Sequence, residues 1–313
     1  MEGENRYYSN TMDNSAHFEN TGSWGRIEAP AKINLHLDVG PPREDGYHGI
    51  RSLFAMVDLK DDMCMRVLDK QEGECIVEGS FTFPSEKNLI CKAYRSFAAL
   101  SGWKKGVHVS VTKRIPDQGG LGGGSSNAAA ALKLLQHLSG TPLNPGELHR
   151  AALETGSDVP FFLSGPVSLV ESRGEILGRV DVREDVGELV VLLIFPPFGV
   201  STADAYKNLD NRRKERGREG VRQLQREHIV SAYVHEGPEK WPFYNSFTEV
   251  LKEMYPPYIH IFNTIQAGEA LFYEISGSGA TVFAVFDDPN KAEKMEKGIK
   301  KDGISARQVK MLA

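Results

Sequence analysis

Hydrophobic and polar residues alternate strictly between residues 32 and 39, near the beginning of the chain. Successive side chains of a strand point to opposite sides, so apolar residues at every second position share one face. The alternation therefore predicts a half-buried strand, with Lys32 and Asn34 near its start. We expect the two later residues of the polar row, His36 and Asp38, to be solvated.

Apolar spacing further along the chain predicts both strands and helices. Strands are predicted over residues 58–67, 75–77, 107–112, 189–195 and 281–286, where apolar residues alternate or run continuously. Helices are predicted over residues 88–100, 126–138, 147–155 and 289–301. Because strands and helices do not alternate regularly, the pattern indicates a mixed α+β fold.

The composition narrows the class of protein. The 313 residues suffice for two packed domains, and 40% hydrophobic against 25% charged residues is typical of a globular protein. A net charge of −5 gives no general attraction for nucleic acid or an anionic membrane. No run of 18 apolar residues predicts a transmembrane helix.

The N-terminal residues and the cysteines indicate the cellular compartment of the protein. Residues 1–23 are polar and lack the apolar segment of a secretory signal, so we expect a disordered leader there. The three cysteines form no C-x-x-C pair, which favours a reduced, cytoplasmic protein.

The most informative stretch is a glycine-rich turn before the predicted helix at 126–138. Five of the six residues from Gly119 to Gly124 are glycine, so their backbone N–H groups are unshielded. The helix start adds unpaired N–H donors and the positive end of its dipole, which favours a bound phosphate. Ser125 stands where a Walker A loop needs lysine and a dinucleotide fingerprint needs glycine, so neither motif fits. The alternative is a flexible turn with Ser126 capping the helix.

Other segments carry further candidate chemistry. Ser276–Ala280 is a second glycine-rich turn, placed before a predicted strand. Asp158 precedes Pro160, where a carboxylate suits either the cap of a short helix or a general base. The role of Lys32 is also open between a functional residue and an ordinary solvated lysine, since a lysine on a strand face is usually solvated.

In chain order, Pro30–Leu35, Pro116–Ala129 and Ser276–Phe283 resemble the three motifs of the GHMP kinase superfamily, named for galactokinase, homoserine kinase, mevalonate kinase and phosphomevalonate kinase. The resemblance narrows to a branch whose acceptor is a cytidine-diphosphate-linked methylerythritol, through residues 46–54, 87–90, 156–162, 201–206 and 245–247. It extends from about Ile27 to the C-terminus. It implies a two-domain α+β fold, with a ribosomal-protein-S5-like domain over 24–175 and a ferredoxin-like domain over 176–313.

The resemblance implies an ATP-dependent kinase that phosphorylates a hydroxyl of this acceptor in non-mevalonate isoprenoid synthesis, with Mg²⁺ offsetting the phosphate charge. Asp158 would be the general base, and Lys32 would keep it ionised and stabilise the incipient alkoxide. The implied ATP contacts are Asn88, Gly119, Gly120, Leu121, Gly122, Gly123, Gly124, Ser125 and Ser126. The implied acceptor contacts are Asn34, Tyr47, His48, Tyr206, Gly277 and Ser278.

Within that acceptor site, the resemblance implies that Tyr47 stacks on the cytosine, His48 bonds its edge and Tyr206 covers its second face. Ordinary packing at a domain edge is the alternative for these three residues. Asn88 also suits the cap of the helix that begins at Leu89.

The chain departs from the superfamily pattern near the first glycine-rich turn. Asn127 follows the serine pair where the pattern usually has Asp, and Gln118–Leu121 differs from the usual Gly-Ala-Gly-Leu. The change to Asn removes a negative charge near the phosphates. A charge-rich segment over 212–227 is longer than the resemblance implies, and we interpret it as a solvated helix or surface insertion.

Two rival functions are considered. One is another small-molecule kinase, of the mevalonate or homoserine type, against which the pair Tyr47–His48 argues. The other is a non-catalytic nucleotide-binding regulator, against which the presence of both Lys32 and Asp158 argues. We expect a small-molecule substrate, no nucleic-acid or membrane partner, and a monomer or weak homodimer.

Overall fold

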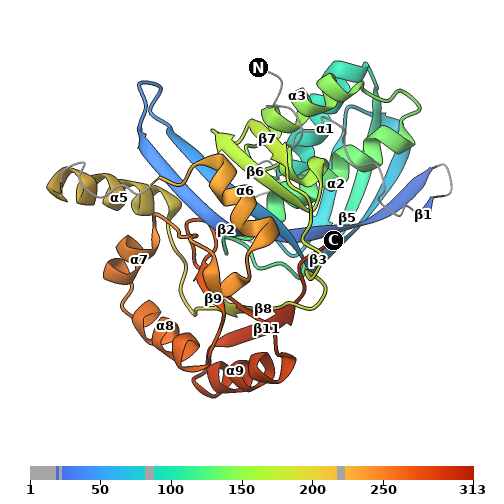
Figure 1. Ribbon diagram of the computed structural model, residues 1–313. Coiled ribbons are helices and arrows are strands. Elements are labelled where there is room, and N and C mark those ends of the chain that lie inside the picture. Colours follow the sequence, from blue (N-terminus) through green and yellow to red (C-terminus); the bar gives the residue numbers. More distant parts are fainter. Residues whose placement is uncertain (1–18, 21–22, 82–87, 217–222) are drawn as a thin grey trace.

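The computed structural model describes residues 19–20, 23–81, 88–216 and 223–313, which form two β-sheets packed with helices (Figure 1). Most of the predicted leader and residues 217–222 of the charge-rich segment lie outside this range. Among the described residues, no helix combines the length and apolar character needed to cross a membrane.

The larger sheet has the strand order β1-β2-β3-β5-β4, and β6 and β7 extend it from β3. Its strands are β1 (Glu19–Asn20), β2 (Trp24–Pro42), β3 (His48–Glu72), β4 (Cys75–Gly79), β5 (Lys105–Thr112), β6 (Val167–Ser172) and β7 (Ile176–Arg179). Its helices are α1 (Leu89–Ser101), α2 (Gly123–Leu138), α3 (Pro145–Thr155) and α4 (Phe161–Ser164). The sheet continues through β7, four residues past residue 175; the division into domains at 175 stays a prediction.

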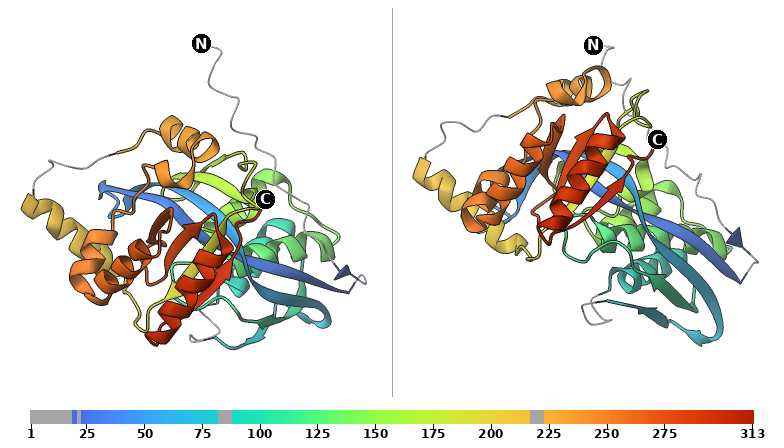
Figure 2. Two further views of the ribbon diagram at one scale, coloured as in Figure 1. Left: turned by 60° about the horizontal axis from the view of Figure 1, so that its bottom comes forward. Right: turned by 90° about the horizontal axis from the view of Figure 1, so that it is seen from below.

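The smaller sheet is antiparallel and has the order β11-β8-β10-β9. Its strands are β8 (Val190–Phe195), β9 (Phe272–Ile275), β10 (Val282–Phe286) and β11 (Ser305–Val309). The helices of this half are α5 (Thr202–Arg216), α6 (Arg226–His235), α7 (Thr248–Met254), α8 (Pro257–Ala267) and α9 (Pro289–Lys301), with a short 3₁₀ helix at Pro238–Lys240. Figure 2 shows α9 lying along this sheet, away from α1–α3.

A long hairpin joins the two halves of the molecule. β2 pairs with β3 from Trp24 opposite Arg66 to Pro42 opposite His48. The hairpin crosses the molecule from β1 to α5 (Figure 1). The face of β2 that carries Ile33 and Leu35 packs into a core shared with the smaller sheet. Both halves therefore meet along β2.

The polar row of β2 is buried, so the predicted solvation of His36 and Asp38 is wrong. Their exposed fractions are 0% and 3%, because the segment before α7 covers this face. The backbone N–H of Tyr244 donates to Nδ1 of His36, and Ser246 donates to Asp38. Burial lowers the pKa of His36 to about 3 and raises the pKa of Asp38.

Helix α2 brings the first glycine-rich turn to the middle of β2. Its four alanines, 128–131, are at most 4% exposed and pack in the core of the larger sheet. Small side chains let a helix approach a sheet closely. The turn before α2 is tied directly to β2, since Lys32 donates its backbone N–H to the carbonyl of Leu121 at 2.9 Å.

Candidate active site

The first glycine loop, Gly119–Ser126, needs glycine at specific positions. Gly120 and Gly122 have φ of 75° and 70°, in the left-handed region that favours glycine. A Cβ at Gly120 would lie 2.1 Å from the carbonyl oxygen of Ser276. Gly122 is the N-cap of α2, and no side chain in the described part of the chain caps this helix, so the alternative in which Ser126 caps it is wrong. The first N–H groups of α2 are therefore free to meet an anion.

A second glycine loop, Ser276–Ala280, docks on the first. The hydroxyl of Ser276 donates to the carbonyl of Gly120 at 2.9 Å, and Thr281 donates its backbone N–H to Gly119 at 3.2 Å. The side-chain amide of Asn245 donates to the carbonyls of Ile275 and Gly277, both at 2.7 Å. The smaller half of the molecule thus supplies one wall of the site.

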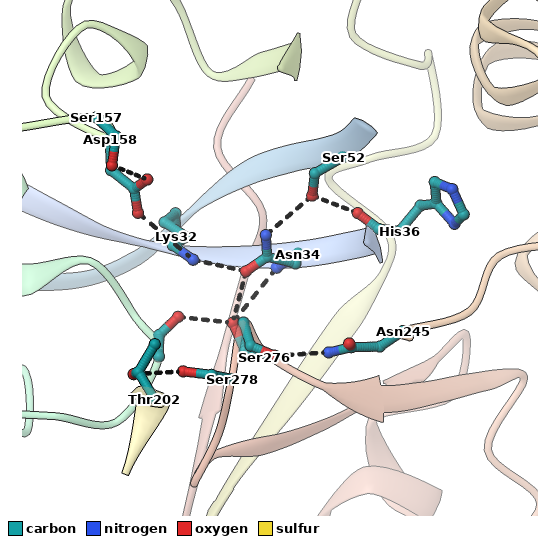
Figure 3. A network of polar contacts seen from close by, with 12 residues as sticks. Lys32, Asn34, His36, Ser52, Ser157, Asp158, Thr202, Asn245, Ser276 and Ser278 are labelled. Carbon is teal, nitrogen blue, oxygen red and sulfur yellow. Dashed lines mark hydrogen bonds and ion pairs between the residues drawn. The ribbon is translucent and has the colours of Figure 1, made fainter. Parts of the chain in front are cut away.

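Lys32 and Asp158 face each other at this junction (Figure 3). Nζ of Lys32 lies 3.9 Å from Oδ2 of Asp158 and 4.7 Å from the ring centre of Phe54. The lysine side chain is 5% exposed, whereas that of Asp158 is 29% exposed. Burial lowers the pKa of Lys32 below its usual value, and the neighbouring carboxylate of Asp158 offsets only part of this shift. The pair joins a sheltered ammonium to a carboxylate that a ligand can reach.

Asp158 does not cap a helix, which was the alternative to its role as a general base. Helix α4 has Pro160 as its N-cap residue and no side-chain hydrogen bond there. The carboxylate instead accepts from the hydroxyl of Ser157 at 3.5 Å and lies beside Lys32.

Asn34 connects Lys32 to both halves of the molecule. Its Oδ1 accepts from Nζ of Lys32 at 2.6 Å, and its Nδ2 donates to Ser52 at 2.9 Å. Ser52 in turn donates to the carbonyl of His36, while Ser276 contributes its hydroxyl from the second glycine loop (Figure 3). Because every member is buried, this network holds the lysine in one position.

Two clefts meet at the first glycine loop, and Gln118, Gly120 and Gly122 line both. The Asp158 cleft has a volume of about 570 Å³ and contains Lys32, Asn34 and Tyr206. The second glycine loop lines it with Gly277, Ser278 and Gly279. The Asn88 cleft, of about 400 Å³, lies on the other side of the loop.

The Asn88 cleft is lined by all of the ATP contacts predicted from the sequence except Ser126. Its lining includes Asn88, Ser125 and the loop from Gly119 to Gly124. Asn88 also caps α1, since its side chain accepts from the N–H of Ile90 at 3.0 Å, so the predicted cap is confirmed. Nδ2 of Asn88 and the hydroxyl of Ser126 are buried without a partner among the described residues. Buried polar groups are ordinarily paired, so the amide of Asn88, which lines this cleft, suits contact with a ligand.

A buried carboxylate next to this cleft was missed in the sequence. Asp61 is 0% exposed and accepts from the backbone N–H groups of Arg114 and Ile115 at 2.7 and 2.9 Å. Lys113 and Asn127 also donate to it, Asn127 at 3.0 Å. Asp61 therefore ties the entry of the first glycine loop to its exit. The sequence gives only a weak signal, since Asp61 stands between the charged residues Lys60 and Asp62 of a predicted strand, and Lys113 lies just before the loop.

The same contacts explain Asn127. Its Nδ2 donates to Asp61, and its Oδ1 accepts from Lys113 at 3.3 Å. An aspartate at this position would place a second carboxylate beside a fully buried one. The amide is thus complementary to Asp61.

The aromatic residues predicted to hold a base are only partly brought together. Tyr206 lines the Asp158 cleft, and its ring packs against His48 at 4.8 Å between centres and against Phe247 at 4.9 Å. Burial raises the pKa of Tyr206, and Asp158 and Asp210 raise it further. Neither Tyr47 nor His48 lines this cleft.

Tyr47 stands apart from the other two rings. It is 56% exposed, and the guanidinium of Arg173 lies 4.1 Å from its ring centre. That contact covers one face of the ring, so the predicted stacking partner would use the other.

Two family models match the chain. The one described as GHMP kinases N terminal domain matches residues 88–166, and the one described as GHMP kinases C terminal matches residues 233–305. The first match contains the first glycine loop and Asp158, and the second contains the second glycine loop.

Curated relatives match most of the chain. The 4-diphosphocytidyl-2-C-methyl-D-erythritol kinase of Shouchella clausii is 35% identical over 285 residues, which are 88% of this chain and 90% of the relative. The kinase of the same name from Thermotoga maritima is 36% identical over 271 residues, covering 86% and 94% of the two chains.

Solved structures share the fold of this chain. The crystal structure of a 4-(cytidine 5′-diphospho)-2C-methyl-D-erythritol kinase has 28% sequence identity and a TM-score of 0.75, covering 92% of this chain and 99% of that one. A homoserine kinase from Cytophaga hutchinsonii has a TM-score of 0.71 over 94% and 96% of the two chains, and at 20% identity it shows the fold alone.

Proposed function

The chain belongs to the 4-diphosphocytidyl-2-C-methyl-D-erythritol kinases of the GHMP kinase superfamily, and from this membership we propose how its residues carry the reaction. The family, the two-domain α+β GHMP fold and the kinase activity expected from the sequence are thereby confirmed. The enzyme phosphorylates its cytidine-diphosphate-linked acceptor with ATP in isoprenoid biosynthesis. The rival mevalonate-type, homoserine-type and non-catalytic assignments are set aside.

Asp158 is the general base in our proposal, and its pairing with Lys32 beside the first glycine loop carries the argument. The carboxylate takes the proton from the acceptor hydroxyl as that oxygen bonds to the γ-phosphorus and the bond to ADP breaks. Its exposure in the Asp158 cleft lets a hydroxyl reach it. The ammonium of Lys32, 3.9 Å away, faces the carboxylate and stabilises negative charge on the attacking oxygen.

Asn34 acts on this pair by holding the lysine. It binds Nζ of Lys32 at 2.6 Å and is itself held by Ser52 and Ser276. A donor that is already held in position needs little reorganisation when negative charge develops on the attacking oxygen, which is the advantage of such a network.

ATP occupies the Asn88 cleft in this proposal, with its phosphates on the first glycine loop. The free N–H groups at the start of α2 and its dipole favour the phosphates. The unpaired Nδ2 of Asn88 offers a donor to the adenine. The γ-phosphate would then reach the shared edge of the two clefts, near Gly120 and Gly122.

Mg²⁺ fits this site through hydroxyl and phosphate oxygens. No group of three or more metal-binding side chains occurs in the described part of the chain. The hydroxyl of Ser125, which lines the Asn88 cleft, would be one oxygen donor, and the unpaired hydroxyl of Ser126 is buried beside it in the chain. Mg²⁺ is commonly bound mainly by substrate phosphates and water, and it supplies charge neutralisation there.

The acceptor lies in the Asp158 cleft, where Gly277 and Ser278 of the second glycine loop contact it. Its cytosine is held at the margin of the cleft by Tyr206, His48 and Tyr47. The 4.8 Å contact between His48 and Tyr206 supports a base site there.

The remaining properties are the oligomeric state and the cellular location of the enzyme. We propose a cytoplasmic monomer or weak homodimer. Sedimentation analysis at micromolar concentration checks the assembly, and a stable higher oligomer would contradict it.

Coupled ADP-release kinetics test the catalytic pair. Asp158→Asn and Lys32→Met should each lower kcat by about 10²- to 10⁴-fold, with the KM for ATP nearly unchanged. Ser157→Ala is the matched control, because Ser157 touches Asp158 only at 3.5 Å. If Asp158→Asn turned over at the wild-type rate, Asp158 could not be the general base.

A further inference from the structure

A carboxylate outside the predicted site holds the ring of His48. Nε2 of His48 lies 3.0 and 3.1 Å from the two carboxylate oxygens of Asp210, in α5. The side chains are 10% and 21% exposed, so the contact is sheltered from solvent. The ring also packs on Tyr206, which lines the Asp158 cleft.

The contact selects one tautomer of the imidazole. An ionised carboxylate only accepts hydrogen bonds, so Nε2 must carry the proton. In the neutral ring, Nδ1 is then an acceptor. Within the described ranges, no residue donates a hydrogen bond to Nδ1 of His48. This acceptor is left for a ligand.

The imidazole ring of His48 lies at the margin of the Asp158 cleft. His48 and Ile50 are two residues apart in β3 and so point to the same face of the strand. Ile50 lines the Asp158 cleft, and so does Tyr206, whose ring packs against the imidazole. A base that lies against Tyr206 at the margin of the cleft presents its edge to His48.

We propose that Asp210 is a positioning residue that fixes His48 as an acceptor and thereby selects cytosine over uracil. This inference rests on the proposed function, which places the cytosine of the substrate at His48. Position 4 of cytosine carries an amino donor, whereas uracil has a carbonyl acceptor there. An Nδ1 acceptor therefore pairs with cytosine and opposes uracil. Uracil has a donor only at N3, one ring position away, and would have to shift to reach it.

The selectivity test compares the cytidine substrate with its uridine counterpart. Wild type should prefer cytidine in kcat/KM by about 10- to 100-fold, the range of one base-edge hydrogen bond. Asp210→Asn permits either tautomer, because an amide both donates and accepts. Most of the preference should be lost through a higher KM for the cytidine substrate, with kcat at saturation kept.

Two further variants separate positioning from general charge or folding effects. Asp210→Glu keeps an acceptor on α5 and should restore part of the preference. Asp204→Asn removes the same charge from an exposed position of α5 and should change nothing. An unchanged preference in Asp210→Asn would overturn the proposal.

The tautomer is read directly by ¹⁵N NMR of histidine-labelled protein, with His48 assigned through His48→Gln. The free wild type should show the proton on Nε2, and Asp210→Asn should show a mixture. A proton on Nδ1, or a doubly protonated ring, would overturn the proposal even if selectivity were seen. If wild type turned over neither substrate, the proposed function would fail separately, and calorimetric binding of CDP against UDP would then decide the selectivity.

Discussion

Replacing Gly120 by alanine tests whether the two glycine loops form one unit. The new Cβ would lie 2.1 Å from the carbonyl oxygen of Ser276 and 2.8 Å from that of Gly279, both of them backbone atoms. A non-glycine residue with left-handed φ costs about 1–2 kcal/mol, and relieving an overpacked contact costs about 1–3 kcal/mol more. The substitution should therefore destabilise the protein by about 2–5 kcal/mol.

Thermal unfolding and turnover measure the effect together. For a chain of this size, that loss corresponds to a fall in Tm of about 5–15 °C. Separation of the loops would also break the hydrogen bond from Ser276 to Gly120, and with it the support of Asn34. We therefore expect kcat to fall as well.

Gly124→Ala is the matched control for stability. Its Cβ would meet only Cδ1 of Leu89, at 3.8 Å, and Gly124 lies within α2. Alanine in a helix is favoured over glycine by about 0.5–1 kcal/mol, so Tm should stay the same or rise. If Gly120→Ala kept both the wild-type Tm and the wild-type kcat, the docking of the two loops would be refuted.

Two further predictions concern carboxyl groups at buried or half-buried positions. Asn127→Asp places a second carboxylate beside Asp61, where Lys113 is the compensating charge in contact with both positions. Urea unfolding at pH 7 should show a loss of about 2–4 kcal/mol in the free energy of unfolding, and the loss should shrink at pH 5. An unaltered unfolding midpoint would contradict the account of Asn127. Burial raises the pKa of Glu274 from 4.5 to about 7, so the folded protein holds this proton more tightly than the unfolded chain. The resulting stability is fully present below pH 4.5 and is lost as the pH rises through about 7, with an upper limit of about 3 kcal/mol. Glu274→Gln should flatten the dependence of Tm on pH between 5 and 8, and an unchanged slope would show that another group titrates.

Local sequence determined the elements that build the site. The alternation at residues 32–39 encodes a strand, and the glycine run before Ala128 encodes an open turn at a helix start, because both depend on neighbours along the chain. The capping role of Asn88 is local in the same way. The resemblance of the motifs added the family and the kinase activity.

Only the tertiary structure decided which polar groups are buried and what they contact. His36 and Asp38 follow the pattern of a solvated face, yet residues 244–246 cover them. Asp61 shows no periodic signal, and its four donors come from segments more than 50 residues away. Periodicity reports which side chains share a face but not what packs against that face. Partners distant in sequence meet only when the two sheets fold together, and for that reason the support of Lys32 and the pairing of His48 with Asp210 appear only in three dimensions.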